Sequence, residues 1–161
     1  MAAVAKAAGD AVTVEYASAG IARAKDILAR MQNEVAAKNY EVVKTLSQEA
    51  IQAAEKAITD GLAAKAKARD DANTLLSTQR AALTEARKAL ADASAVRGIQ
   101  FDKAAIERDI GEAERNITSA GTDIAAENFR AAGTKAQTAR ALLAGVRQRL
   151  ADATQAATRK K

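Results

Sequence analysis

The chain has 161 residues, of which 45 are alanine, and it carries a formal net charge of +5. It contains no proline, cysteine, histidine or tryptophan, which excludes disulfides, Cys or His zinc sites and catalytic units built on histidine. We therefore expect no enzyme, no metal site and no cofactor, and the scarcity of aromatic and β-branched clusters argues against a sheet.

Four segments carry apolar residues at alternating spacings of three and four, which is the heptad repeat of closely packed helices. The first predicted helix covers residues 11–37. Its repeat consists of Ile21, Ala24, Leu28, Met31 and Val35. A short polar turn, Lys38-Asn39-Tyr40, ends this helix, and Asn39 is a suitable N-cap for the next one.

The second predicted helix covers residues 40–96. Its middle, between Leu62 and Leu75, has no large apolar residue and is rich in charge. Two interpretations are open: one continuous helix of roughly 57 residues, about 85 Å long at 1.5 Å per residue, or a break near Asp60-Gly61 or Asp70-Asp71. We favour continuity, because proline is absent and helix-forming residues are abundant.

Two further helices are expected, over residues 102–125 and 128–158. The break at Arg97-Gly98-Ile99 suits a glycine in the left-handed conformation that ends helices, and Asp102 is a suitable N-cap. Gly121-Thr122-Asp123 competes with residues 126–128 for the last break, which we place at 126–128 because Ile124 continues the repeat. The heptad series of the second helix consists of Leu76, Gln79, Leu83, Ala86, Leu90 and Ala93. That of the third helix consists of Ile106, Ile110, Ala113, Ile117, Ala120 and Ile124. That of the fourth helix consists of Phe129, Ala132, Ala136, Ala139, Leu143, Val146, Leu150, Ala153 and Ala157.

An internal repeat relates the two halves. The pairs Asn39-Tyr40 and Asn128-Phe129 each precede an alanine-rich amphipathic helix, and Tyr16 and Phe101 lie near the start of the helix before. We expect these aromatic side chains to wedge the ends of helical hairpins, where alanine alone would leave a gap.

The predicted fold is all-α: an elongated antiparallel helical bundle with Ala-rich coiled-coil packing, built from two related helical hairpins. We expect a single helical domain over residues 1–161, with hairpin-like halves at about 11–96 and 97–158.

The first half resembles a bacterial family of alanine-rich helical proteins that is known as a domain of unknown function and includes many envelope lipoproteins. The residues that carry the resemblance are Tyr16-Ala17-Ser18, Ala22-Arg23-Ala24-Lys25, Leu28, Ala36-Ala37-Lys38-Asn39-Tyr40 and Ala50-Ile51-Gln52-Ala53-Ala54. Ser18 stands where the family commonly has proline, and Asn39 where it more often has aspartate. The resemblance covers about residues 16–58, with a fainter copy at 101–146. It implies an envelope or periplasmic protein and brings no catalytic residues.

Basic residues concentrate at the C-terminal end of the chain. Residues 130–161 hold eight basic residues and one acid, whereas residues 101–129 hold seven acids and three basic residues. The last helix can therefore pack antiparallel on the acidic one, with flanking charges setting the register, or it can bind an anionic partner. The candidate residues for anion or partner contact are Arg140, Arg147, Arg149, Arg159, Lys160 and Lys161.

The sequence favours a non-enzymatic structural or protein-interaction module that offers long helical faces to a protein partner. The alternative is a binder of nucleic acid or acidic lipid through the basic C-terminal helix. No aromatic side chain interleaves with these charges, which argues against nucleic acid. The alanine-rich apolar faces bury too little area for strong membrane insertion, so peripheral membrane contact is the most that we expect. Oligomer formation stays open.

The location in the cell follows from the resemblance, which implies the periplasm or the cell envelope; without it, the cytoplasm is expected. No segment is apolar enough to suggest a transmembrane helix. Residues 1–14 contain Lys6 and Asp10 and lack a long apolar run, so we do not expect this segment to be a signal peptide. A cytosolic protein and a protein whose leader has been removed both fit this pattern.

Overall fold

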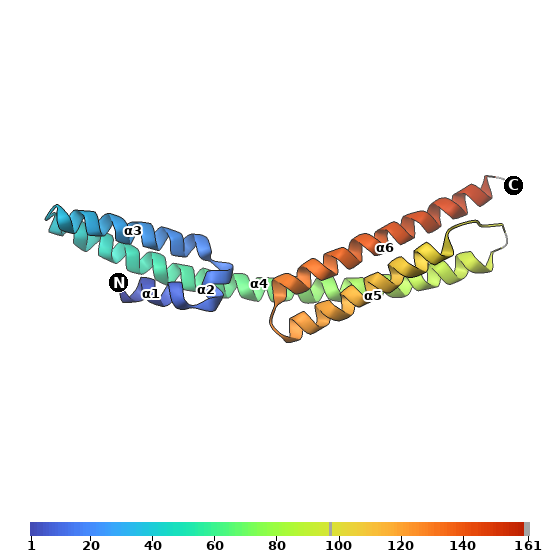
Figure 1. Cartoon of the computed structure of the whole chain (residues 1–161), viewed down its shortest axis with the longest axis horizontal. Helices are drawn as coiled ribbons and strands as arrows, with labels where there is room; N and C mark the ends of the chain where they lie inside the picture. The colour runs from blue at the N-terminus through green and yellow to red at the C-terminus, as the bar shows by residue number, and fades with distance from the viewer. Residues whose placement is uncertain (97, 160–161) are drawn as a thin grey trace. The chain divides into compact units, whose positions relative to one another are not determined.

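The chain is described by a computed structural model that covers residues 1–96 and 98–159. Within these ranges it forms six helices and no strand (Figure 1), which confirms the predicted all-α fold. The helices are α1 (Ala2–Gly9), α2 (Ala11–Tyr16), α3 (Ser18–Ala36), α4 (Tyr40–Ala95), α5 (Lys103–Ala125) and α6 (Phe129–Thr158). They pack as two compact units, Met1–Lys67 and Ala68–Lys161, so the two parts of α4 belong to different units. The single domain with two hairpin-like halves stays a prediction.

The predicted boundaries hold for α4, α5 and α6. The central helix α4 is continuous from Tyr40 to Ala95, so neither of the two breaks considered in its middle occurs. Gly98 adopts a positive φ of 93° after its end, while its neighbour Arg97 lies outside the described residues. Asp102 caps α5, because its carboxylate accepts a hydrogen bond of 2.9 Å from the backbone N–H of Ala105.

The prediction is wrong at the N-terminus, where two helices replace the one expected over residues 11–37 and a further helix precedes them. Helix α1 precedes the expected start, and Ala17 leaves the helical region with φ −136° and ψ 34°, which separates α2 from α3. Alanine is a strong helix former, so no local signal marks this break. The break separates two helices that each approach the backbone of α4 closely, α2 at Gly61 and α3 at Ala57.

The core of the first unit is built from α1, α3 and the N-terminal part of α4. Its buried residues are Val4, Ala7, Ile21, Ala24, Ile27, Leu46, Ala50, Ala54 and Ala57. More than half of these are alanine, so the helices pack closely around small side chains. Two glycines tighten the packing: a Cβ on Gly20 would lie 2.8 Å from Cβ of Ala57, and a Cβ on Gly61 would lie 3.1 Å from Cα of Thr13.

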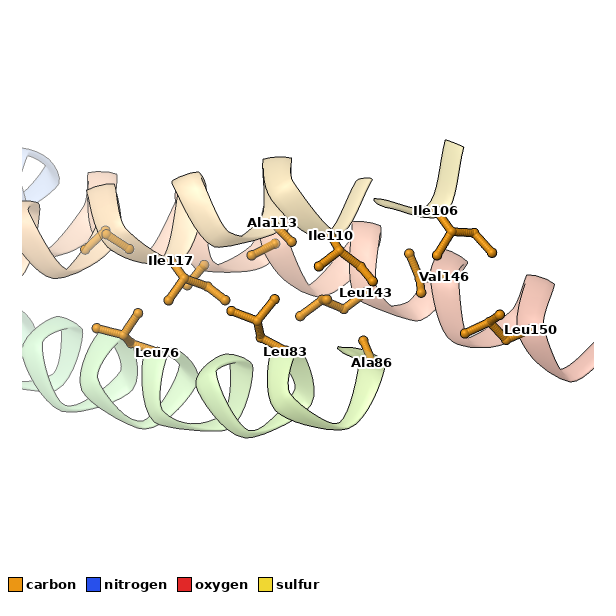
Figure 2. Close-up of a cluster of buried hydrophobic side chains, with 14 of the residues drawn as sticks. Leu76, Leu83, Ala86, Ile106, Ile110, Ala113, Ile117, Leu143, Val146 and Leu150 are labelled. Atoms are coloured by element: carbon orange, nitrogen blue, oxygen red, sulfur yellow. The ribbon is translucent and has the colours of Figure 1, made fainter. Parts of the chain in front are cut away.

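The core of the second unit follows the predicted heptad series. Figure 2 shows Leu76, Leu83 and Ala86 of α4 pointing toward side chains of α5 and α6. In α6 every residue of the series from Phe129 to Leu150 is buried, and in α5 so is every one from Ile106 to Ala120. The alternating spacing therefore predicted the buried faces of α5 and α6 correctly.

The turns after α3 and α5 have the same backbone geometry. Lys38 and Glu127 occupy the left-handed region, with φ of 63° and 60°. In the first turn, Lys38 N–H donates to the carbonyl of Val35 and Asn39 N–H donates to that of Glu34; in the second, Glu127 and Asn128 make the equivalent bonds to Ile124 and Asp123. This is the Schellman motif that commonly ends helices. Asn39 does not act as the predicted cap, because its amide donates to Glu34 (2.7 Å). Its counterpart Asn128 makes no side-chain cap either.

The aromatic side chains fill hairpin ends in only part of the chain. Phe129 is buried at the start of α6, and Phe101 packs against the core of the second unit, as expected. Tyr40, in contrast, is 67 % exposed, so the predicted wedge is wrong at this position. Tyr16 is half-buried and ends α2 instead of lying near the start of a long helix.

Candidate functional site

Four basic residues of α6 divide into two groups according to the helix they face. Lys135 and Arg149 face α5: Lys135 Nζ lies 2.6 Å from an Asp123 carboxylate oxygen and donates to Ser119 Oγ (2.7 Å), and Arg149 forms an ion pair with Asp109. The interpretation in which the basic helix packs on the acidic one is thus confirmed for these two residues. They stabilise the α5–α6 pairing.

Arg140 and Arg147 belong to the second group and line a groove between α4 and α6. Within the part of the chain that the structure describes, neither guanidinium forms an ion pair or a hydrogen bond. The groove has a volume of about 430 Å³ and is lined by Thr78, Gln79, Ala82, Glu85, Ala86, Ala89, Arg140, Leu143, Ala144 and Arg147. The structure therefore brings two of the six predicted site residues together.

Gln79 is the buried polar residue of this groove. It occupies a position of the predicted heptad series and is only 3 % exposed. Its side-chain amide makes no hydrogen bond with any described residue, although it lines the groove. The amide is not one of the fully buried, unpaired polar groups of the described residues, so it keeps contact with the groove and is available to a ligand that enters it.

The groove continues toward the C-terminal ends of α4 and α6. This second part has a volume of about 570 Å³ and shares Ala89 and Arg147 with the first. Its lining is mostly apolar or small, with one acid on α4: Ala89, Asp92, Ala93, Val96, Ile99, Arg147, Leu150, Ala151, Thr154, Gln155 and Thr158. We call the two parts together the α4–α6 groove.

The rims of the α4–α6 groove carry opposite charges. Glu85 and Asp92 lie on the α4 rim, seven residues apart, and Arg140 and Arg147 lie on the α6 rim with the same spacing. Seven residues are two helical turns, so each pair lies on one face of its helix, about 10 Å apart. No ion pair joins the two rims among the described residues. Sequence reasoning missed Glu85 and Asp92, and their heptad spacing was the signal that could have found them.

The other predicted site residues lie elsewhere. Arg159 is exposed at the C-cap of α6. Lys160 and Lys161 lie outside the described residues. The six basic residues therefore do not form one common anion surface in the described part of the chain.

The first unit has a groove of its own, between α3 and α4. Its volume is about 460 Å³, and Gly20 and Ala57 are among its lining residues. Charged side chains of both signs surround it, including Lys56 and Asp60, which pair with each other at 2.8 Å. The lining residues are Ala19, Gly20, Arg23, Ile27, Glu49, Gln52, Ala53, Lys56, Ala57 and Asp60.

The acidic residues of the chain are mostly engaged with basic neighbours or exposed. Glu114 of α5 pairs with Arg87 of α4 at 2.6 Å, and Asp70 pairs with Arg69 at 3.0 Å. In residues 1–96 and 98–159 no group of three or more acidic side chains is placed to hold a metal ion.

The carboxylate of Asp10 has a clearly shifted pKa. Hydrogen bonds from Thr13 Oγ1 (2.6 Å) and Thr13 N–H (2.7 Å) lower the pKa of Asp10 below its usual 3.8, with a smaller contribution from Lys6. Asp10 is the N-cap of α2, so this carboxylate has a structural role in the first unit.

No helix in the described part of the chain is long and apolar enough to cross a membrane.

A family model described as a domain of unknown function (DUF4398) matches residues 1–73, which span the whole first unit and the first residues of the second. No curated protein and no solved structure matches the chain. The resemblance seen at residues 16–58 lies inside the matched segment. The N-terminal part of the chain is therefore similar to a family of unknown function.

Proposed function

We propose that the chain is a non-enzymatic helical module that binds a protein partner along its helix faces, in the bacterial cell envelope. The observation that carries this proposal is the α4–α6 groove, in which four charged rim residues and the amide of Gln79 lack partners within the described chain. Other charged residues of the same unit, such as Lys135 and Arg149, are already used in its internal pairing.

The lining of the groove favours a helix as the bound element. Ala82, Ala86 and Ala89 line its α4 side and Ala144 its α6 side. Small side chains let a neighbouring helix approach closely, since the distance between helix axes depends on the side chains at the contact. Placing an amphipathic helix in a groove is a recurring mode of protein recognition.

The alternative function, binding of an anionic polymer or membrane surface, has support from the unpaired Arg140 and Arg147. The opposite rim weighs against it, because Glu85 and Asp92 would repel phosphate groups that lie along the groove. A protein partner can satisfy both rims at once, so we prefer it.

The envelope location is supported only by the resemblance of residues 16–58 to a family with many envelope lipoproteins. Fractionation of the cells that produce the protein from its native gene tests it. We expect the protein in the periplasmic or membrane fraction. If the protein were recovered with the cytosolic markers, the proposed envelope location would be wrong, and the binding proposal would be unaffected.

Site-specific photocrosslinking tests the binding proposal in those cells. A photoreactive residue replaces Ala144, which lines the groove and is exposed, or Ala104, which is exposed on α5 and lines neither part of the groove. We expect one discrete protein adduct from position 144 and none from position 104. Equal labelling at both positions, or no adduct from position 144, contradicts the proposal.

A further inference from the structure

We infer that the occupant of the α4–α6 groove is an amphipathic helix of a partner protein with flanks of opposite charge. Acidic residues seven apart on one flank would face Arg140 and Arg147, and basic residues on the other flank would face Glu85 and Asp92. The inference rests on the proposed function and specifies its partner.

The charges of the rims carry the inference. The two arginines of the α6 rim have no acidic partner in the described chain, and the two acids of the α4 rim have no basic one. Both pairs have heptad spacing, which a partner helix matches along its own length, because the flanking positions of a heptad repeat set pairing in coiled coils. Extended polymers such as single-stranded nucleic acid carry charge of one sign and match only one rim.

The size and floor of the groove agree with a helix. Its lining runs from Thr78 of α4 to Val96, just after the end of that helix, and from Arg140 to Thr158 on α6, which is about 27 Å along the helices. The floor is mostly alanine, with Leu143 and Leu150 below it. A partner helix with small apolar residues on its seam can therefore approach the floor closely.

Gln79 adds a polar contact inside the groove. Gln79 as a whole is only 3 % exposed, but its amide lines the groove and has no hydrogen-bond partner among the described residues. A polar side chain on the seam of the partner helix would satisfy it and fix the register, as a single buried polar residue does in coiled coils.

A designed peptide tests this inference on the full chain. The probe is a fluorescent 21-residue helical peptide with alanine and leucine on its seam, glutamate on one flank and lysine on the other. A control peptide has the same seam and glutamine in place of every flanking charge. Binding is measured by fluorescence anisotropy at moderate salt, and circular dichroism verifies that each protein variant is folded.

We expect the double substitution Arg140→Gln/Arg147→Gln to weaken binding of the charged peptide roughly fivefold, as two partly exposed ion pairs are lost. Arg108→Gln/Arg115→Gln is the matched control, since these two arginines are also seven residues apart and exposed, on α5. It should leave the affinity unchanged. The acidic-rim variant Glu85→Gln/Asp92→Asn should also weaken binding of the charged peptide. None of these variants should change the affinity for the uncharged peptide.

Four outcomes overturn the inference. The first two are equal affinity of the chain for both peptides, and equal weakening of peptide binding by the arginine variant of the groove and by the α5 control. The third is tighter peptide binding after the acidic rim is removed. The fourth is binding of phosphatidylglycerol vesicles or a single-stranded oligonucleotide that depends on Arg140 and Arg147 and is tighter than peptide binding. If the charged peptide does not bind while the cross-link from position 144 still forms, the inference of a helical partner with charged flanks is wrong and the proposed function stands. If the cross-link is also absent, both fall.

Discussion

Single residues decide how closely the helices of the first unit approach. A Cβ on Gly20 would meet Cβ of Ala57 at 2.8 Å and Cα of Ala57 at 3.3 Å. Neither atom belongs to a flexible side chain, so the added methyl would separate α3 from α4. Gly145 is the opposite case, because it lies in the middle of α6, is exposed, and has nothing within 4 Å of its would-be Cβ.

We expect opposite effects of alanine at these two glycines. Gly20→Ala should lower the free energy of unfolding by roughly 1 kcal/mol or more, because overpacking outweighs the better helix propensity of alanine. Gly145→Ala should raise it by about 1 kcal/mol, since only the propensity changes. Urea unfolding followed by circular dichroism measures both. Stabilisation by Gly20→Ala would show that α3 and α4 are not in close contact at this point.

Asp10 links the stability of the first unit to pH. Its pKa is lowered in the folded chain by the two hydrogen bonds from Thr13. A carboxylate with a lowered pKa stabilises the folded state above its unfolded pKa, near 3.8. That contribution is lost as the pH falls through the folded pKa.

The variant Asp10→Asn isolates this effect, because asparagine keeps an acceptor for Thr13 and does not titrate. We expect the wild-type chain to melt at a higher temperature than the variant at neutral pH. The difference should shrink as the pH falls below about 3.8 and vanish in strong acid. Melting temperatures measured between pH 2 and 7 give the result. A difference that does not change with pH would mean that the Asp10 charge has no part in capping α2.

At the scale of helices, the sequence predicted the second unit well. Regular spacing in α5 and α6 identified both the buried faces and the ends, because each helix packs one continuous stripe against its neighbours. In α3 the same pattern was less accurate, since Val35 belongs to the series and is 47 % exposed. The break at Ala17 was not predicted, because alanine itself favours helix, and the close contacts of α2 and α3 with α4 on either side of it are seen only in the fold.

The candidate site was only partly predictable for a related reason. Sequence identified the basic face of α6, but charge counts do not say which side of a helix faces which neighbour. Lys135 and Arg149 turn to the acids of α5, whereas Arg140 and Arg147 turn to α4. The opposing acids of the rim are on α4, far away in the sequence, so their relation to the arginines needed the fold.

The turn after α3 makes a further prediction at this scale. Lys38 has φ 63° in the Schellman motif, a conformation that costs a residue with a side chain roughly 1–2 kcal/mol and glycine very little. Lys38→Gly should therefore raise the free energy of unfolding by about 0.5–1 kcal/mol, after the larger entropy of glycine in the unfolded chain is subtracted.

The control for that substitution is Lys44→Gly, because Lys44 is an exposed residue inside α4. It should lower the free energy of unfolding by about 1 kcal/mol. Both values come from the same urea titration. If Lys38→Gly were as destabilising as Lys44→Gly, the left-handed geometry of residue 38 would be wrong.

At the scale of the whole molecule, each unit has a core of its own. The two clusters of buried residues have no member in common, although α4 contributes to both. Ile106 lies in the core of the second unit and is 1 % exposed. Removing its side chain should open the second unit more readily than the first.

Hydrogen exchange of Ile106→Ala measures this difference. The substitution should cost roughly 2–5 kcal/mol in the second unit. Amide exchange should become faster in α5, α6 and residues 68–95 and stay unchanged in α1 and α3. Val4→Ala in the core of the first unit should give the reverse pattern. Uniformly faster exchange in either variant would show that the chain opens as one cooperative body.

The alanine seam between α5 and α6 also limits how such a chain can evolve. Ala113, Ala120, Ala136 and Ala139 are completely buried. Enlarging any one of them would force the two helices apart, and glycine there would weaken the helix. Accepted changes at the seam must therefore come as compensating pairs, whereas outward positions can drift freely. Distant relatives would keep the spacing of small residues while losing most of their overall identity, so they would be found by that spacing.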